Sequence, residues 1–490
     1  MTNITFDYDS GRRKGILISD CLSVVREHFS VEDKGQMFKR RFHAGYRPPS
    51  RVYAITPQGR FEPRLVSVII DYIKNTYIDN VFEFTNAFKT ATKLPKLDGT
   101  QVFQLPITSV KPLRDYQLEC VSLSLEKGSG VIVLPTSAGK TLVMATLIAS
   151  IQNQLADNFK TLVLVPDTGL VTQSYQDFIE YGIESDRLTK WTGSNTPDEK
   201  ASIIIANSQI LLSEKQDTSI LKEIQLLVID EVHKLKHSNK ISKLVSKIPA
   251  KMRYGLTGTI PEELLDRWHI IGQLGDIVYQ KKSIDLRQQS YISNVKVVVL
   301  RMQYIDPPHI RASSSENPTE AYEQELEFLQ SNKFRNETIK TIVSSLTKNS
   351  LVLVDRIAHG KVLLEVLSSV EGKDVHFICG EVEVEERERV RTLMEERDNI
   401  ICVAISKIFS TGVNIKNLHY IFFASIGKAK TKIIQSIGRS LRLHENKKQA
   451  VIFDIGDDMR YGNKHLQERL NLYTSESIPC ITREIKQTHE

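Results

Sequence analysis

The residues with the clearest chemistry form a short loop of small residues that ends in Gly139, Lys140 and Thr141. An apolar run at 131–134 precedes the loop and an apolar stretch at 142–151 follows it, which predicts strand, loop and helix in that order. Such a loop turns backbone N–H groups inward at the positive end of a helix, where they can bind a nucleoside triphosphate. We expect Lys140 to reach the β- and γ-phosphates and the Thr141 hydroxyl to coordinate Mg²⁺. The general pattern begins with glycine where this chain has leucine, and a chance Gly-Lys-Thr at a helix start is the competing interpretation.

Two consecutive carboxylates, Asp230 and Glu231, end an apolar run 90 residues after Lys140. A carboxylate at the end of a buried strand beside a phosphate loop can hold Mg²⁺ through water, and the next one can orient and deprotonate an attacking water. We expect Asp230 to take the first role and Glu231 the second. Two acids after a strand can also form a solvated turn, but the phosphate loop that precedes them favours the catalytic interpretation.

Two arginines near the end of the chain, Arg439 and Arg442, are three residues apart, so on a helix they share one face. They could therefore act together on one external anion. A γ-phosphate transition state held between two domains requires such cations. A solvated helix face is the alternative, and the position of the pair in a second α/β unit favours the catalytic role.

These residues require two successive α/β units to position them. From about residue 108, short apolar runs alternate with longer amphipathic stretches, which is typical of a parallel sheet flanked by helices. The expected buried strands of the first unit are 131–134, 161–165, 202–206, 226–229 and 254–256. Those of the second unit are 351–354, 375–378, 400–405, 420–424 and 450–453.

Breaks in this alternation predict the domain boundaries. Residues 1–107 lack it and contain an apolar helix candidate at 65–77, so we expect a small α+β module there. A proline- and serine-rich stretch separates the two α/β units, and the Glu-rich helix around 319–330 is interpreted as a solvated arm. The expected segments are 1–107, an α/β domain at 108–285, a linker and arm at 286–331, an α/β domain at 332–458, and a tail at 459–490 that is helical and then frayed.

Composition limits the class of protein. A chain of 490 residues suggests about three folded units, and 41% hydrophobic with 25% charged residues excludes disorder and fibrous repeats. The five cysteines are far apart and contain no Cys-x-x-Cys pair, so neither a disulfide framework nor a zinc site is supported. No apolar run approaches the length of a membrane span and the first residues do not resemble a signal peptide, so we expect no membrane partner and a cytoplasmic location.

Seven motifs follow one another in an order and spacing that resemble the helicase motifs of superfamily 2, over about residues 110–455. They are RDYQ at 114–117, PTSAGKT at 135–141, VPDT at 165–168, DEVH at 230–233, LTGT at 256–259, STGVNI at 410–415 and QSIGRSLR at 435–442. Within that superfamily the chain is most similar to the UvsW-type bacteriophage branch-migration DNA helicases. The resemblance implies an α/β fold with two tandem RecA-like domains after a small α+β domain, and an ATP-dependent DNA helicase that hydrolyses ATP with Mg²⁺.

The resemblance also implies roles around ATP. Gln117, with Arg114 nearby, would read the adenine edge, and Thr257 and Thr259 would couple the nucleotide site to DNA. Many relatives have aspartate at the position of Asn414, so this contact lacks their charge. His233 would link the two domains, or it is an ordinary helix-start histidine. The expected nucleotide contacts are Arg114, Gln117, Pro135, Thr136, Ser137, Ala138, Gly139, Lys140, Thr141, Gly412, Asn414 and Gln435.

Contacts to a nucleic-acid backbone are implied in both α/β domains. In the first domain they are Pro166, Thr168, Gln173, Asn207, Ser208 and Gln209. In the second they are Asp355, Arg356, His359, Gly380 and Thr411. Several are short polar residues that directly follow strands, so capping of a following helix is the competing explanation for each.

The N-terminal module contains a basic, aromatic stretch at 34–64, with eight cations against one anion and a local charge of +7. The net charge of the whole chain is only +6. Phosphate neutralisation together with base stacking requires this combination, and we expect Arg40, Arg41, Arg47 and Arg51 to contact DNA. A strand with one buried face would show the same alternation of aromatic residues and cations.

The leading hypothesis is a monomeric motor in which ATP hydrolysis drives translocation on DNA and remodels forks, Holliday junctions or R-loops. The resemblance implies 3′-to-5′ movement. An RNA helicase is one alternative, although Asp-Glu-Ala-Asp is absent, and a double-stranded-DNA translocase without strand separation is another. A nucleic-acid scaffold with a vestigial ATP site is disfavoured because Lys140, Asp230 and Glu231 are intact, and a small-molecule kinase would not need the second α/β unit.

Overall fold

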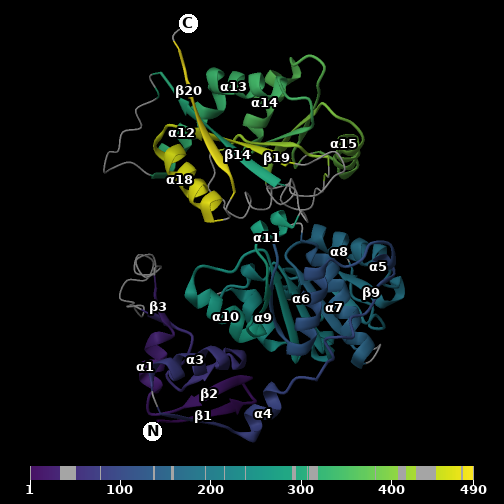
Figure 1. The fold of residues 1–490 in the computed structure, drawn as a ribbon, viewed down its shortest axis with the longest axis vertical. Helices are drawn as coiled ribbons and strands as arrows, with labels where there is room; N and C mark the ends of the chain where they lie inside the picture. Colours follow the sequence, from purple (N-terminus) through teal and green to yellow (C-terminus); the bar gives the residue numbers. More distant parts are fainter. Residues whose placement is uncertain are drawn as a thin grey trace. The chain divides into compact units, whose positions relative to one another are not determined.

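A computed structural model describes most of the chain and divides it into two compact units. The described residues are 2–33, 51–77, 79–135, 138–155, 159–193, 195–213, 216–237, 239–289, 294–305, 307, 318–380, 382–406, 415, 417–425, 449–475 and 478–488. The first unit comprises Met1–Leu134 and Gly139–Gln280, and the second comprises Pro135–Ala138 and Lys281–Glu490 (Figure 1).

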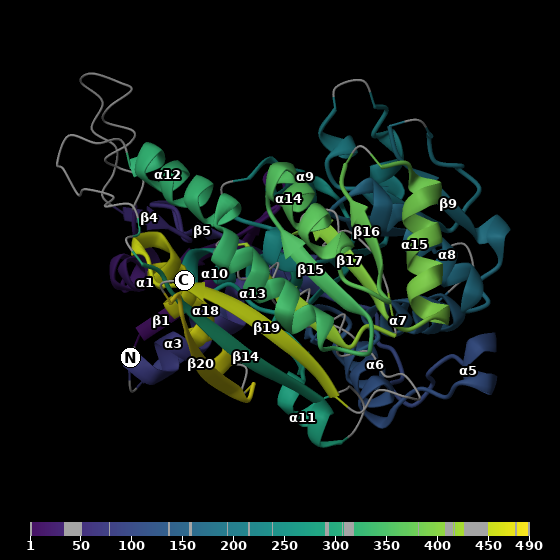
Figure 2. The same cartoon turned by 90° about the horizontal axis from the view of Figure 1, so that it is seen from above.

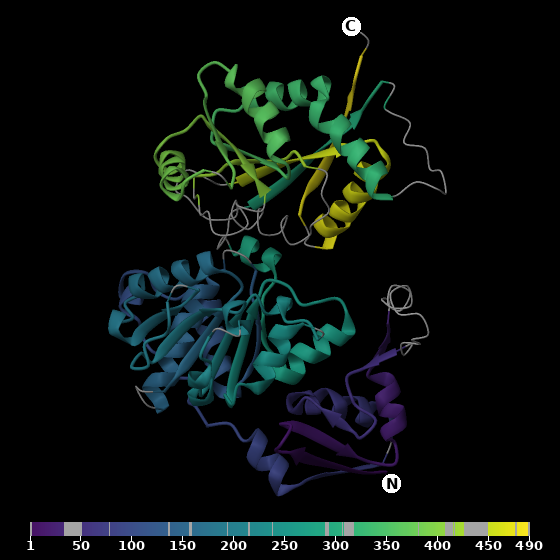
Figure 3. The same cartoon turned by 180° about the vertical axis from the view of Figure 1, so that it is seen from behind.

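The first unit begins with a small module of mixed strands and helices, here called the N-terminal module (Figure 3). Its elements are β1 (Thr2–Asp9), β2 (Lys14–Ile18), α1 (Leu22–His28), β3 (Ser30–Glu32), β4 (Arg51–Tyr53), β5 (Arg60–Phe61), η1 (Pro63–Leu65), α3 (Val66–Thr76), β6 (Asn80–Phe84) and α4 (Asn86–Thr92). The main sheet has the order β5-β2-β1-β6, with β1 antiparallel to β2 and parallel to β6. Ile69 and Ile73, four apart on α3, pack with Phe6 and Phe61 in its core.

The larger part of the first unit is a seven-stranded parallel sheet. Its elements are α5 (Pro106–Val110), α6 (Asp115–Lys127), β7 (Gly130–Val133), α7 (Lys140–Leu155), β8 (Thr161–Val165), α8 (Thr168–Glu180), β9 (Leu188–Trp191), β10 (Ile203–Asn207), β11 (Leu226–Asp230), α9 (Lys240–Lys247), β12 (Met252–Thr257), α10 (Leu264–Leu274) and β13 (Ile277–Gln280). Short 3-10 turns follow α8, β10 and β11. The strand order is β13-β7-β12-β11-β8-β10-β9.

Helices cover both faces of this sheet, with α9 and α10 on one side and α6, α7 and α8 on the other (Figure 1). Val131 and Leu162 belong to the core on the side of α9 and α10, while the alternate residues Ile132 and Val163 are also fully buried. Burial on both faces explains why the strands are continuous apolar runs. The core of the N-terminal module also includes Leu265, Trp268 and Ile271 of α10, so the module packs directly on a helix that covers this sheet.

The second unit contains another seven-stranded parallel sheet, in the order β16-β17-β15-β18-β19-β14-β20 (Figure 2). Its elements are α11 (Ser283–Gln288), β14 (Asn294–Gln303), α12 (Pro318–Ser331), α13 (Lys333–Ser344), β15 (Ser350–Val354), α14 (Ile357–Ser368), β16 (Asp374–Ile378), α15 (Val384–Glu396), β17 (Ile400–Ile405), β18 (Tyr420–Phe423), β19 (Gln449–Asp457), α18 (Arg460–Ser475) and β20 (Cys480–Lys486). Side chains of α13 and α14 pack on one face of the sheet.

The predicted fold class is confirmed, because all ten expected buried strands are present within one or a few residues of their expected bounds. Four further strands, β9, β13, β14 and β20, were not expected from the sequence. β14 lies inside the stretch expected to be linker, and β20 lies where a frayed tail was expected. Most side chains of β20 are exposed, so it has no apolar pattern, and its backbone pairing with β14 is what makes it a strand.

The interpretation of the Glu-rich helix as a solvated arm is wrong. Glu325 of α12 is fully buried, and Leu329 packs beside Met459. The Glu325 carboxylate accepts hydrogen bonds from the backbone N–H groups of Tyr461 (3.0 Å) and Gly462 (2.6 Å) at the start of α18. Helix α12 therefore places a carboxylate at the N-terminus of α18, which is far away in the sequence. A negative charge is stabilised at the N-terminus of a helix.

Among the described residues, no helix is both long and apolar enough to cross a bilayer.

Candidate functional site

Gly139 ends the loop between β7 and α7, which the sequence predicts to bind phosphate. Gly139 adopts a φ of +78°, and a Cβ placed there would lie 2.4 Å from Nε2 of Gln117. The positive φ therefore favours glycine at this position, and a larger residue would also have to displace the Gln117 side chain. Thr136 and Ser137 lie outside the described residues, whereas Pro135 and Ala138 are linked by a backbone hydrogen bond of 3.2 Å.

Lys140 and Thr141 open helix α7, directly after this loop. The Lys140 ammonium donates to the carbonyl of Leu134 at 3.4 Å, so its side chain lies back along the loop. The N–H groups of a first helical turn have no partner within the helix, which makes this end of α7 suited to an anion.

Gln117 connects this loop to α6. Its Oε1 accepts the backbone N–H of Arg114 at 3.0 Å, a capping contact, and its side chain is buried against Gly139. Arg114 also donates to the hydroxyl of Tyr116 at 3.1 Å. The two residues expected at the adenine edge are therefore held in one cap beside the phosphate loop.

The acidic pair lies at the carboxyl end of β11, as the sequence predicted. Asp230 accepts the backbone N–H of Glu231 at 2.9 Å, and Glu231 itself adopts a left-handed conformation with φ of 52°. A non-glycine residue in this region costs roughly 1–2 kcal/mol, so surrounding contacts must hold it there.

Electrostatics separates the two carboxylates. Burial, followed by the charge of Glu231, raises the pKa of Asp230. Burial also opposes ionisation of Glu231, but the hydrogen bond from His233 and the positive charges of Lys140 and His233 outweigh it and lower the pKa of Glu231. Glu231 is therefore ionised at neutral pH, whereas the ionised form of Asp230 would be stabilised by a nearby cation.

A chain of hydrogen bonds leads from Glu231 to the end of β12. The Nδ1 atom of His233 lies 3.2 Å from Oε2 of Glu231 and 2.9 Å from Oγ1 of Thr257. Because the Thr257 hydroxyl donates to the carbonyl of Thr259 at 2.8 Å, it must accept from His233, which requires the proton on Nδ1. This network joins the acidic pair to the segment that the resemblance assigned to coupling.

The donor set fits Mg²⁺, the expected metal. Thr141 and Asp230 offer hydroxyl and carboxylate oxygens, which this cation prefers, and Mg²⁺ is commonly held by one or two carboxylates together with substrate phosphates. A divalent cation beside Asp230 would also supply the positive charge that its raised pKa calls for.

The expected backbone contacts of the first sheet come together at its carboxyl edge. Strands β8 and β10 are neighbours, and Asn207 at the end of β10 donates to Oγ1 of Thr168 at 3.0 Å. Asn207 also accepts the backbone N–H of Gln209 at 2.8 Å, while Ser208 is buried. Thr168 and Gln209 are exposed and form a polar surface at this edge of the sheet, here called the polar ledge. Pro166 and Gln173 are half-buried on the same β8–α8 segment.

The contacts expected in the second sheet differ in accessibility. Arg356, at the start of α14, is half-exposed and pairs with both carboxylate oxygens of Glu323 on α12, at 2.6 and 2.7 Å. His359 is only 3% exposed, and burial lowers its pKa to about 3. Gly380 is exposed after β16. Arg356 and Gly380 are thus reachable by a ligand in this structure, and His359 is not.

The basic stretch of the N-terminal module is less free than its composition suggests. Arg51 lies 2.9 Å from Glu27, and Arg60 lies 3.1 Å from Asp9, so acids outside the stretch compensate both. Phe61, one of the aromatic residues in the stretch at 34–64, is buried in the core and cannot stack on a base.

Several expected site residues lie outside the described residues. They are Arg40, Arg41, Arg47, Thr136, Ser137, Thr411, Gly412, Asn414, Gln435, Arg439 and Arg442.

Sequence reasoning missed a buried ion pair in the second unit. Arg335 of α13 donates to the carboxylate of Asp457 at 2.8 Å, and both side chains are fully buried at the end of β19. Arg335 also donates to the carbonyl of Ala424, at the end of β18. The sequence places Asp457 at the end of an apolar run, which could have indicated a buried acid. Nothing in the sequence links it to Arg335, which lies more than a hundred residues earlier.

Comparison with known proteins agrees with this geometry. The family described as "Type III restriction enzyme, res subunit" matches residues 110–262, and "Helicase conserved C-terminal domain" matches 325–444. Together with the two parallel sheets and the phosphate-loop site, these matches show that the chain belongs to the superfamily 2 helicases, a class of ATP-dependent enzymes that act on nucleic acid.

Within that class the chain is similar to the ATP-dependent DNA helicase uvsW of Enterobacteria phage T4, with 27% identity over 397 residues, 76% of each chain. It is also 23% identical over 310 residues to the DNA 3'-5' helicase XPB of Kineococcus radiotolerans, covering 62% of this chain and 52% of that protein. The Hef helicase domain of Pyrococcus furiosus shares the fold, with a TM-score of 0.51 at 16% identity, over 76% of this chain and all of that one.

Proposed function

We propose that this helicase acts on DNA, moves 3′ to 5′ along one strand, and remodels branched structures such as stalled forks, Holliday junctions or R-loops. The observation that carries the motor is the network from Glu231 through His233 to Thr257, because it ties the hydrolytic acid to the edge of the sheet where nucleic-acid contacts are expected. DNA and branched substrates are proposed from the similarity to the phage T4 helicase, and the direction from the similarity to the bacterial one.

The proposed mechanism assigns each residue one task. Lys140 and the N–H groups at the start of α7 bind the phosphates of ATP. Thr141 and Asp230 would hold Mg²⁺, which when bound would neutralise negative charge on the phosphates of ATP. Glu231 orients the attacking water and accepts its proton, a task for which its lowered pKa keeps it ionised.

Movement along a DNA strand requires ATP hydrolysis to be coupled to the residues that bind the DNA backbone. His233 and Thr257 transmit the state of Glu231 to Thr259. The polar ledge of Thr168 and Gln209, together with Arg356 and Gly380 of the second sheet, binds the strand backbone. Arg439 and Arg442 stabilise the γ-phosphate in the transition state, and Arg40, Arg41 and Arg47 add phosphate contacts in the N-terminal module. The enzyme works as a monomer in the cytoplasm.

The test is ATP-driven remodelling of forks, four-way junctions, R-loops and RNA duplexes with Glu231→Gln beside the wild type. We expect activity on branched DNA, preferred loading on 3′ single-stranded tails, and a loss of hydrolysis of about 10²–10⁴-fold in the variant. Glu180→Gln, an exposed acid at the end of α8, is the matched control. Equal hydrolysis by both variants would remove Glu231 from the mechanism, and activity on RNA duplexes alone would replace DNA as the substrate.

A further inference from the structure

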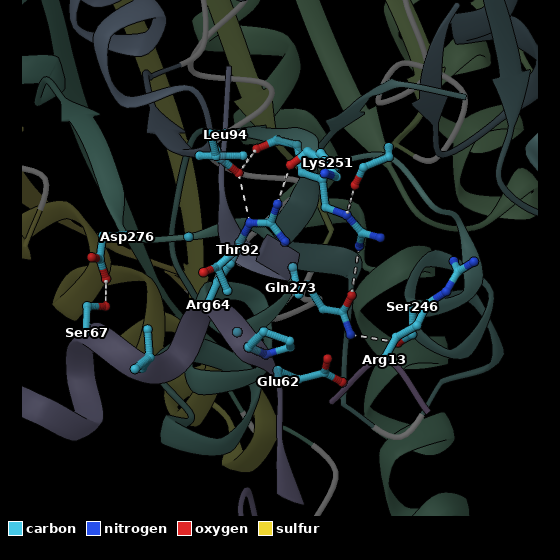
Figure 4. Close-up of a pocket in the computed structure, with 18 of the residues that line it drawn as sticks. Arg13, Glu62, Arg64, Ser67, Thr92, Leu94, Ser246, Lys251, Gln273 and Asp276 are labelled. Carbon is cyan, nitrogen blue, oxygen red and sulfur yellow. Dashed lines mark hydrogen bonds between the residues drawn. The ribbon is translucent and has the colours of Figure 1, made fainter. Parts of the chain in front are cut away.

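A cavity lies in the first unit, between the N-terminal module and the first parallel sheet (Figure 4). Its volume is about 610 Å³, within the range of roughly 300–1,000 Å³ typical of small-molecule sites. The N-terminal module contributes Tyr8, Arg13 and Arg64, and the sheet contributes residues at the amino ends of β7, β12 and β13.

This position separates the cavity from the nucleotide site. Ser129, before β7, lines the cavity, whereas the phosphate loop follows the other end of the same strand. At about 3.3 Å per residue, the four residues of β7 place the two sites about 13 Å apart or more, at opposite edges of the sheet.

Positive charge dominates the cavity wall. Five cations line it, here called the basic cluster: Arg13, Arg64, Lys127, Lys251 and Arg253. Among the described residues of the wall, two are carboxylates, Glu62 and Asp276. Glu62 is already paired with Lys14, and Asp276 accepts a hydrogen bond from Ser67 at 2.9 Å (Figure 4). The wall therefore has a formal surplus of three positive charges.

The arginines of the basic cluster are held by neutral acceptors. Arg253 is only 7% exposed and donates to the carbonyls of Ala250 and Ile248 and to Oε1 of Gln273. Arg64 donates to Oγ of Ser129 at 3.1 Å and to the carbonyl of Lys251 (Figure 4). In the part of the chain that the structure describes, neither arginine has a carboxylate within ion-pair distance.

Burial is unfavourable for the charge of both groups, and the carboxylate of Glu62 offsets only part of this effect. Burial lowers the pKa of Arg253 to about 9, an effect to which the charge of Arg64 adds, and it lowers the pKa of Arg64 to about 10. Both stay protonated at neutral pH, so an anion in the cavity would relieve their mutual repulsion and their desolvation.

We propose that this cavity binds a small phosphorylated molecule of nucleotide size, whose phosphates face the basic cluster. Apolar walls from Val66, Ile248 and Val278 and the ring of Tyr8 would accommodate its non-phosphate part. A nucleic-acid strand fits less well, because Arg253 is only 7% exposed and a phosphate within a continuous backbone could not reach it. Since the walls come from two modules, the bound molecule would stabilise their contact.

The experiment uses the full chain with Lys140→Ala, which disables the phosphate loop, and titrates it calorimetrically with pyrophosphate. We expect one bound pyrophosphate per chain. Adding Arg13→Ala or Arg64→Gln should weaken binding by about tenfold or more, since each removes a charged donor. Arg64→Gln keeps a side-chain amide beside Ser129, and circular dichroism verifies the fold of each variant. Arg12→Ala, an exposed neighbour outside the cavity wall, is the matched control and should leave binding unchanged.

Competition identifies the source of the phosphate. ADP should displace pyrophosphate from the Lys140→Ala chain, and a short single-stranded oligonucleotide should not. The proposal is overturned if pyrophosphate does not bind, if the Arg13 and Arg64 variants bind it as well as the Arg12 control does, or if the oligonucleotide is the better competitor. None of these outcomes depends on helicase activity, so the inference fails separately from the proposed function.

Discussion

The hydrogen-bond network from Glu231 through His233 to Thr257 is tested most directly by Thr257→Val. This substitution keeps the shape of the side chain and removes its hydroxyl. That hydroxyl is fully buried, accepts from His233 at 2.9 Å and donates to the carbonyl of Thr259 at 2.8 Å. His233 would retain Glu231, whereas the carbonyl of Thr259 would lose this donor. An unsatisfied buried group costs roughly 1–3 kcal/mol, so we expect the first unit to lose about 2 kcal/mol of unfolding free energy.

The functional consequence should exceed the effect on stability. ATP affinity should be retained, because Lys140 and the loop are untouched, while nucleic-acid-stimulated hydrolysis should fall by about tenfold or more as the link to Thr259 is cut. The assay compares urea unfolding, nucleotide binding and hydrolysis with and without forked DNA in one set of preparations.

Thr146→Val on α7 is the matched control. Thr146 is also fully buried, but its Oγ1 has no hydrogen-bond partner among the described residues. Removing an unpaired buried hydroxyl should be neutral or stabilising by about 1 kcal/mol. If the two valine variants unfold at the same urea concentration and are equally stimulated by DNA, the network has neither the structural nor the coupling role argued for it.

Three further results are expected. Gly139→Ala should weaken ATP binding, measured by equilibrium titration, because the φ of +78° costs alanine about 1–2 kcal/mol and its Cβ would displace Gln117. Arg335→Met should destabilise the second unit in urea by about 3–5 kcal/mol because Asp457 would be left buried and unpaired, and adding Asp457→Leu should recover much of that loss. The buried His359 should make unfolding free energy fall as the pH drops from 6.5 toward 3, because the unfolded imidazole binds a proton that the folded one refuses; His359→Asn should flatten this dependence in denaturation curves taken across that range.

The basic N-terminal stretch shows how a charge count can mislead. The count over 34–64 is +7, yet Arg51 and Arg60 are paired with Glu27 and Asp9, and Arg64 lines a cavity. The expected DNA contacts of the module therefore depend on residues 34–47. Charge-neutralising substitutions there should reduce the salt dependence of DNA binding, whereas Arg60→Ala should chiefly affect folding.

The sequence by itself determined ten strands of the two parallel sheets and the placing of the phosphate loop and the acidic pair at strand ends. Apolar runs buried on both faces specify parallel strands, and the phosphate loop and the acidic pair each follow directly from a strand, so their geometry is local. The tertiary structure decided which charges are free and which strands complete the sheets. The partners of Arg51, Glu325 and Arg335 lie tens to more than a hundred residues away, and β20 is a strand only because β14 offers its backbone. The cavity with the basic cluster also depends on contacts between distant parts of the sequence, because its walls come from segments that only the folded chain brings together.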